Sequence, residues 1–153
     1  VAACHYPPQG VRGFSPRDAS NFYHDLDQYL ATIDERVIAM PQVEHIDAVD
    51  NLDGILAIPG VDCILIGPAD LSYSLGVPLQ IGHPRVQEAI ATTIAKCNAA
   101  HVPVGIAAGG TVEDYLSWLR RGVSFLPLGS DLSWLSQASG AVLREMRAAT
   151  QGF

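Results

Sequence analysis

The chain has 153 residues, 48% of them hydrophobic, which suits one domain with a single buried core. Nine Lys and Arg stand against 16 Asp and Glu, giving a net charge of −7, and no basic run is interleaved with aromatic residues, so neither nucleic acid nor an anionic membrane is expected as a partner. No apolar run approaches the roughly 18 residues of a membrane span and the first residues do not resemble a signal peptide, so we expect a cytoplasmic protein.

The cysteines and the first residue bear on compartment and completeness. Cys4, Cys63 and Cys97 are odd in number and widely spaced, without Cys-x-x-Cys or Cys/His metal spacing, so neither a disulfide framework nor a zinc site is expected. A reducing compartment fits this pattern. The chain begins at Val1 and not at Met, so we expect it to be a piece of a longer or processed protein.

Predicted strands and helices alternate along the chain. Apolar runs bounded by turn signals predict strands at residues 11–14, 36–44, 63–66, 102–107 and 123–128. Start and stop signals predict helices at residues 15–33, 45–58, 84–97 and 111–121 and a last helix after residue 131. Pro41 lacks a ladder donor, which predicts a bulge or an unpaired position in the second strand.

Such alternation is typical of a parallel sheet covered by helices. A complete (β/α)8 barrel takes about 250 residues, or roughly 30 for each unit, so five units match the carboxyl-terminal part of a barrel. An open five-stranded, doubly wound sheet fits the length equally well, and periodicity does not choose between the two.

Two carboxylates follow neighbouring predicted strands. Glu44 ends the second strand, and Asp70 follows the third after Gly67-Pro68, at the edge where parallel α/β proteins place their chemistry. Adjacent strands lie about 4.8 Å apart, so the two anions can converge and a cation between them would offset their repulsion. Oxygen ligands select a hard ion such as Mg²⁺ or Mn²⁺. The alternative is two solvated side chains, with Asp70 only capping the next helix.

Several motifs occur in order along the chain. They are residues 6–13, Gln42-Val43-Glu44, residues 60–72 ending in GPADLS, Leu75-Gly76 and His83-Pro84. Together they resemble the HpcH/HpaI family of class II pyruvate aldolases over essentially the whole chain. The resemblance implies a (β/α)8 TIM barrel of the phosphoenolpyruvate/pyruvate type and a homo-oligomer. It also implies a metal-dependent carbon–carbon lyase that cleaves 4-hydroxy-2-oxo acids to pyruvate and an aldehyde.

The resemblance assigns roles to particular positions. Glu44 and Asp70 match the two metal-ligand carboxylates, for Mg²⁺ or Mn²⁺ and with Co²⁺ as a further candidate. A chelated ion would act as a Lewis acid for the enolate formed by C3–C4 cleavage, so no Schiff-base lysine is needed, and Lys96 is expected on a helix away from the site. The implied substrate-binding residues, which include the turn that receives the pyruvate carboxylate, are Gly67, Pro68, Ala69, Asp70 and Ala107.

Two catalytic groups of the family have no match in this chain. Its general base, a His, and the Arg that holds the oxo oxygen come from the first three βα units of the barrel. Arg12 is interpreted as structural, and Ala107 stands where a larger apolar residue is usual, which predicts a wider or differently selective pocket. The chain's own histidines are interpreted as surface or helix-start residues: His5, His24, His45, His83 and His101.

We therefore expect residues 1–153 to form the carboxyl-terminal part of a single aldolase barrel domain, roughly strands 4–8, with the base and the Arg outside the chain. One alternative is a relative of the citrate lyase or malyl-CoA lyase type, although sparse Arg and Lys argue against a CoA site. The other is a catalytically incomplete half-barrel that serves as a structural or interaction module and self-associates through its open sheet edge.

Overall fold

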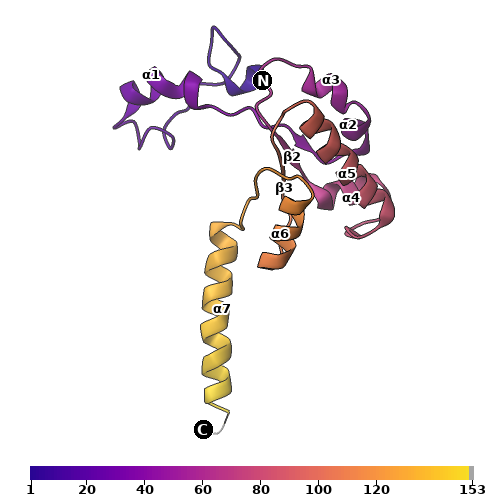
Figure 1. Cartoon of the computed structure of the whole chain (residues 1–153). Helices are drawn as coiled ribbons and strands as arrows, with labels where there is room; N and C mark the ends of the chain where they lie inside the picture. Colours follow the sequence, from indigo (N-terminus) through magenta and orange to yellow (C-terminus); the bar gives the residue numbers. More distant parts are fainter. Residues whose placement is uncertain (152–153) are drawn as a thin grey trace.

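The computed structural model describes residues 1–151 and shows an α/β fold built on a parallel sheet (Figure 1). The strands lie side by side in sequence order: β1 (Gln42–Val43), β2 (Ile64–Ile66) and β3 (Val104–Ile106). Gln42 pairs with Leu65, and Leu65 with Gly105, so the strands are level with one another. A further parallel bridge joins Gly105 to Phe125, where a strand is predicted. The predicted parallel α/β sheet is confirmed.

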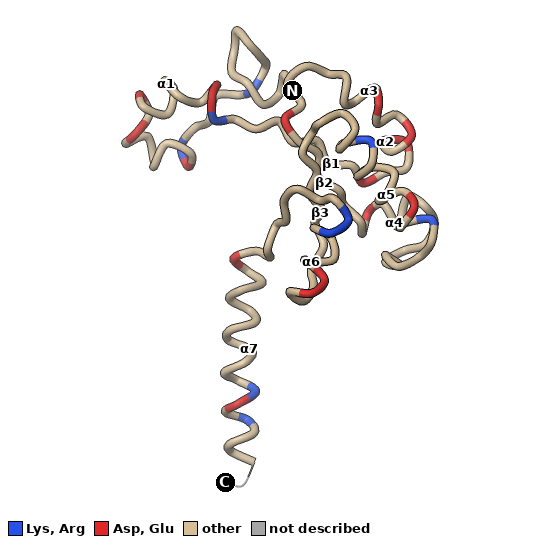
Figure 2. The backbone as a smooth tube through the Cα atoms, viewed as in Figure 1, with Lys and Arg blue, Asp and Glu red and all other residues tan. Residues whose placement is uncertain are grey.

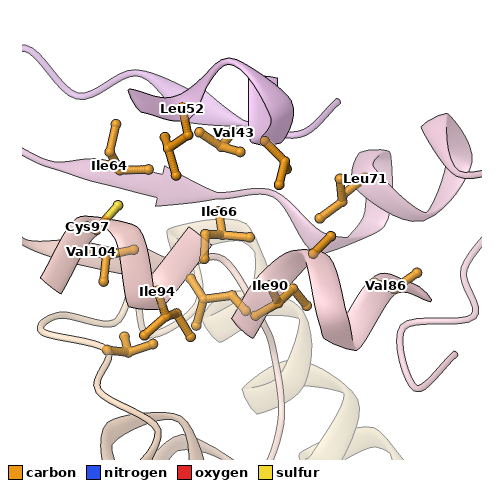
Figure 3. Packing of buried hydrophobic residues seen from close by; sticks show 14 of the residues in the cluster. Val43, Leu52, Ile64, Ile66, Leu71, Val86, Ile90, Ile94, Cys97 and Val104 are labelled. Atoms are coloured by element: carbon orange, nitrogen blue, oxygen red, sulfur yellow. The ribbon is translucent and has the colours of Figure 1, made fainter. Parts of the chain in front are cut away.

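Helices cover one face of this sheet. They are α2 (Ile46–Asp50), α3 (Leu52–Leu56), α4 (Pro68–Ser74) and α5 (Pro84–Ala99). Figure 3 shows apolar side chains from strands and helices meeting in one cluster, among them Val43, Ile66 and Ile90. Ile66 and Ile90 are completely buried. Successive residues of a strand point to opposite faces. The residues that alternate with these buried side chains therefore point away from the helices.

On the face opposite this helical layer, polar side chains lie at β1 and an aromatic ring lies at β3. Gln42 and Glu44 alternate with the buried Val43, so they lie on this second face together with Gly105. The ring of Phe125 packs directly on Gly105, where a Cβ atom would overlap it. Only glycine allows this close contact between the third strand and the chain that follows it.

The sheet is open and apolar beside β1, which forms its edge. Ile38 and Met40 expose 65% and 44% of their surface. With Cys63 and Phe125 they line a groove of about 510 Å³ that runs from this edge across the second face toward β3. An edge strand with free main-chain groups and apolar neighbours offers a surface on which further chain can pair.

The ends of the chain extend away from the core in Figure 1. The remaining elements are η1 (Ala2–Cys4), α1 (Leu26–Arg36), α6 (Val112–Arg120) and α7 (Asp131–Ala149). Figure 2 shows acidic positions on several helices, among them α1, α2 and α6. Within residues 1–151, no helix combines the length and the apolar character needed to cross a bilayer.

The predicted strand at residues 11–14 is wrong. The N–H groups of Val11 and Arg12 donate to the carbonyls of Ala2 and His5, at 2.8 and 2.9 Å. Each main-chain N–H is one donor, so a bond to the first turn of the chain withdraws it from a sheet ladder. A short apolar run is compatible with either arrangement.

The helix predicted at residues 15–33 begins only at Leu26. Asn21, Phe22 and Tyr23 have φ values of 52°, 54° and 71°, which lie in the left-handed region. A right-handed helix cannot continue through three such residues, so the segment before Leu26 forms turns. Helical spacing of apolar residues did not indicate this break, because none of the three is glycine.

Other elements match their predictions in type and differ in length. The helix predicted at residues 45–58 is divided into α2 and α3 around Asn51. The strand predicted at residues 36–44 is regular only in β1, after Pro41. The Pro41 carbonyl accepts from the Leu65 N–H at 3.1 Å, but Pro41 has no N–H to donate in return. The helices predicted near the carboxyl terminus are confirmed as α5, α6 and α7.

Candidate active site

The three strands end level with one another at their carboxyl edge. Their last residues are paired in register, so the residues that follow them, Glu44, Gly67 and Ala107, form one row. Main-chain bonds hold this row: the Gly67 N–H donates to the Val43 carbonyl at 3.0 Å, and the Ala107 N–H to the Ile66 carbonyl at 2.9 Å. Glu44 and Ala107 therefore lie at the edge where parallel sheets bind their ligands.

Asp70 lies in the first turn of α4, directly beyond this row. Gly67 is the N-cap and Pro68 the first helical residue, a position that proline favours. Leu71 is buried in the core, whereas Ala69 and Asp70 are exposed at the start of the helix. The alternative in which Asp70 caps the helix is wrong, because Gly67 occupies the capping position.

The side chain of Glu44 lies against Gly67. A Cβ atom on Gly67 would be 3.0 Å from the Cβ and 3.1 Å from the Oε2 of Glu44. Such distances are tighter than ordinary van der Waals contacts, so the absence of a side chain at Gly67 leaves the space that Glu44 occupies. The half-buried carboxylate of Glu44 thus borders the strand–helix junction that carries Asp70.

Gln42 also borders this site, although sequence reasoning did not select it. Its Nε2 would lie 2.8 Å from a Cβ atom on Gly67, so its amide lies beside the same space as the Glu44 carboxylate. Residues two apart in a strand share a face, and this period was the signal in the sequence. The amide adds one hydrogen-bond acceptor and two donors to the carboxylates of Glu44 and Asp70.

The donor atoms at this edge suit a hard divalent cation. Glu44 and Asp70 bear carboxylate oxygens, which Mg²⁺ and Mn²⁺ prefer. Among residues 1–151, no group of three or more His, Cys, Asp or Glu side chains is placed to hold a metal ion. A site made of the Glu44 and Asp70 carboxylates would leave coordination positions for water or substrate oxygens, unlike a closed zinc site.

Gly67→Ala is expected to weaken Mn²⁺ binding about 10-fold, the scale on which groups that orient ligands act. The φ value of Gly67 is −101°, which alanine adopts freely, so the effect comes from displacing Gln42 and Glu44. Free Mn²⁺ measured by electron paramagnetic resonance gives the affinity. Gly82→Ala is the matched control, because nothing lies within 4 Å of a Cβ atom there. Equal affinities of the two variants would contradict the placement of Glu44 in the site.

Comparison with known sequences decides the family. The sequence profile of the HpcH/HpaI aldolase/citrate lyase family matches residues 1–138. The chain belongs to this family. It is 37% identical over 141 residues to the 5-keto-4-deoxy-D-glucarate aldolase of Shigella boydii, a match that covers 91% of this chain and 54% of the relative. It is 35% identical over 143 residues to the 2-dehydro-3,6-dideoxy-6-sulfogluconate aldolase of Pseudomonas putida, covering 94% and 56%.

Solved structures agree with this HpcH/HpaI assignment. The HpcH/HpaI aldolase/citrate lyase family protein of Burkholderia cenocepacia superposes with a TM-score of 0.75 and 37% identity, over 94% of this chain and 57% of that one. Macrophomate synthase superposes with a TM-score of 0.73 and 28% identity, over 99% and 54%. The chain spans about half the length of the curated relatives that it matches.

Two histidines of this HpcH/HpaI chain cap helices. His45 caps α2, where its Nδ1 accepts from the Asp47 N–H at 3.2 Å. His83 caps α5 in the same way and accepts from the Arg85 N–H at 3.2 Å. The interpretation of both as helix-start residues is confirmed.

Lys96 is also placed as expected. It lies in the last turn of α5, and its Nζ bonds to Oδ2 of Asp53 at 2.9 Å. Because α5 runs back toward the start of β3, this turn lies at the opposite end of the sheet from Glu44. Lys96 is therefore away from the carboxyl edge of the sheet, as the sequence predicts.

Proposed function

We propose that this chain is the metal-binding and pyruvate-binding part of a carbon–carbon lyase. The reaction is the reversible aldol cleavage of a 4-hydroxy-2-oxo acid to pyruvate and an aldehyde. The observation that carries the proposal is the carboxylate of Glu44 seated against Gly67, beside the exposed turn of Ala69 and Asp70. The names of the relatives, which are aldolases of oxo acids related to sugars, support this reaction class.

We further propose that residues 1–153 form the carboxyl-terminal part of one (β/α)8 barrel domain, roughly strands 4–8. Parallel strands in sequence order with helices on one face are the architecture of a barrel wall. The uncovered second face would then be the barrel interior, and the open edge beside β1 would pair with an earlier strand. The chain covers 54% and 56% of two relatives, which supports its assignment to part of a barrel.

The chemistry assigned to this chain is binding and orientation. Glu44 and Asp70 would hold Mg²⁺, Mn²⁺ or Co²⁺, and the bound ion would supply Lewis acidity at the 2-oxo group of the substrate. The first N–H groups of a helix lack partners inside it, so those of Ala69 and Asp70 suit the carboxylate of pyruvate. Ala107 lies in the same row as Glu44, where its small side chain leaves room for a larger aldehyde portion.

The proton-transferring base and the Arg for the oxo oxygen are proposed to come from protein outside residues 1–153. The placement of His45 and His83 at helix starts supports this, because both use their Nδ1 as an acceptor for the main chain.

A homo-oligomer is proposed as the working form. Leu132, Leu135 and Val142 expose 74%, 69% and 61% of their surface along α7, which supports a protein partner for that helix.

Exchange of the pyruvate methyl protons in D₂O, followed by NMR, tests this function. In the protein that includes the proposed base and Arg, we expect exchange with added Mg²⁺ or Mn²⁺, its loss with a chelator and its return when the ion is restored. Exchange requires that a proton leaves C3, so it reports the half-reaction without the aldehyde. A folded protein that binds the ion and still shows no exchange would favour the catalytically incomplete half-barrel.

A further inference from the structure

Ser74, at the end of α4, makes two hydrogen bonds, one within its own helix and one to a segment far from it in the sequence. Its hydroxyl donates to the Leu71 carbonyl of its own helix at 2.8 Å. Its Oγ accepts from the Ile46 N–H at 3.1 Å, 28 residues earlier. Both bonds are partly buried, so competition from water is reduced.

The two partners of Ser74 adjoin the two carboxylates of the site. Leu71 directly follows Asp70, and Ile46 is separated from Glu44 by one residue. Ile46 is the first residue of α2, and the N–H groups of a first turn have no partner within the helix. The Ser74 hydroxyl therefore satisfies this N–H and joins the backbone that follows Glu44 to the backbone that follows Asp70.

We propose that Ser74 is a positioning residue that sets the spacing of Glu44 and Asp70 for a shared divalent ion. The inference rests on the proposed function, since it assumes that these carboxylates bind the ion. Asp70 lies on a seven-residue helix, and Glu44 directly follows β1. The hydroxyl of Ser74 supplies a direct link between the segments that leave these elements. A change in this link moves one carboxylate relative to the other.

Two other serines show what is specific to Ser74. The Ser72 hydroxyl donates to the Ala69 carbonyl and accepts from the Leu79 N–H at 2.8 Å, so it joins α4 to the following loop and not to the Glu44 segment. The Ser117 hydroxyl donates to the Asp114 carbonyl in α6 at 2.8 Å, which is the same bond within a helix as that of Ser74. Ser117 lies on α6, which carries neither carboxylate, and is the matched control.

The test measures Mn²⁺ affinity of the intact protein from free Mn²⁺ by electron paramagnetic resonance, together with thermal unfolding. Ser74→Ala is expected to weaken Mn²⁺ binding about 10-fold. Ser74→Thr keeps a hydroxyl and is expected to restore affinity to within about threefold of the parent, whereas Ser117→Ala leaves it unchanged. Ser74→Cys, with a weaker donor of similar shape, is expected to lie between Ser74→Ala and the parent and serves if the alanine variant does not fold.

The outcomes separate this role from the site itself. The positioning role alone would be overturned if Ser74→Ala and Ser74→Cys bind Mn²⁺ as tightly as Ser117→Ala does. In that outcome Glu44→Gln still does not bind the ion. A lower unfolding temperature with unchanged Mn²⁺ affinity of the folded variants would show a merely structural serine and would also overturn it. A folded parent protein that binds no Mn²⁺ would overturn the proposed site and this role with it.

Discussion

Glu44→Gln is expected to reduce Mn²⁺ affinity by more than about 100-fold and to remove metal-dependent binding of oxalate. Groups that only orient metal ligands already contribute about 10- to 100-fold, so loss of a ligand carboxylate exceeds that range. The amide keeps the shape that fits beside Gly67, so the fold should be unaffected. Asp70→Asn is expected to act in the same way. Calorimetry with oxalate, an enolate mimic, in the presence and absence of Mn²⁺ measures both effects.

The control for this experiment must remove one negative charge elsewhere. Glu113→Gln does so on α6, where Glu113 is exposed and bonded to Arg120 at 2.6 Å. This variant should bind Mn²⁺ and oxalate as the parent does, which separates ligation from the general effect of the net charge of −7. If Glu44→Gln and Asp70→Asn bind oxalate as tightly as the parent, the metal assignment is wrong.

The strands that carry the site could be predicted because the apolar pattern in the sequence matches the burial of those residues in the structure. The apolar run before Gly67 predicts a strand buried by helices, and Ile66 at its end is completely buried. Regular alternation of strands and helices then places Glu44 and Asp70 at the same edge of a parallel sheet. Each step uses contacts that are local or between neighbouring units.

The features that the sequence did not show depend on backbone conformation and on contacts between segments. The left-handed residues from Asn21 to Tyr23 have ordinary side chains, so no glycine signalled the turn that delays α1. Gln42 enters the site because Gly67, directly after the next strand, leaves room for it. The bridge through Ser74 depends on a contact with Ile46 that no periodic pattern encodes. Contacts between segments far apart in the sequence decide the last two.

Leu71→Ala is expected to lower the free energy of unfolding by about 3 kcal/mol, within the range of about 2–5 kcal/mol for buried Leu to Ala changes. Leu71 is completely buried in the cluster of Figure 3, and it follows Asp70 directly on α4. The change removes the anchor that holds the start of this short helix on the sheet. Urea denaturation followed by circular dichroism measures the loss of stability.

Leu116→Ala makes the same chemical deletion at a side chain that is 39% exposed on α6. It should lower the free energy of unfolding by less than about 1 kcal/mol, because less apolar surface is removed from the core. Equal losses for Leu71→Ala and Leu116→Ala would show that α4 is not anchored through Leu71. If the two losses differ as expected, the Mn²⁺ affinity of the folded Leu71→Ala protein should also fall, because the helix that carries Asp70 is no longer held in position by Leu71.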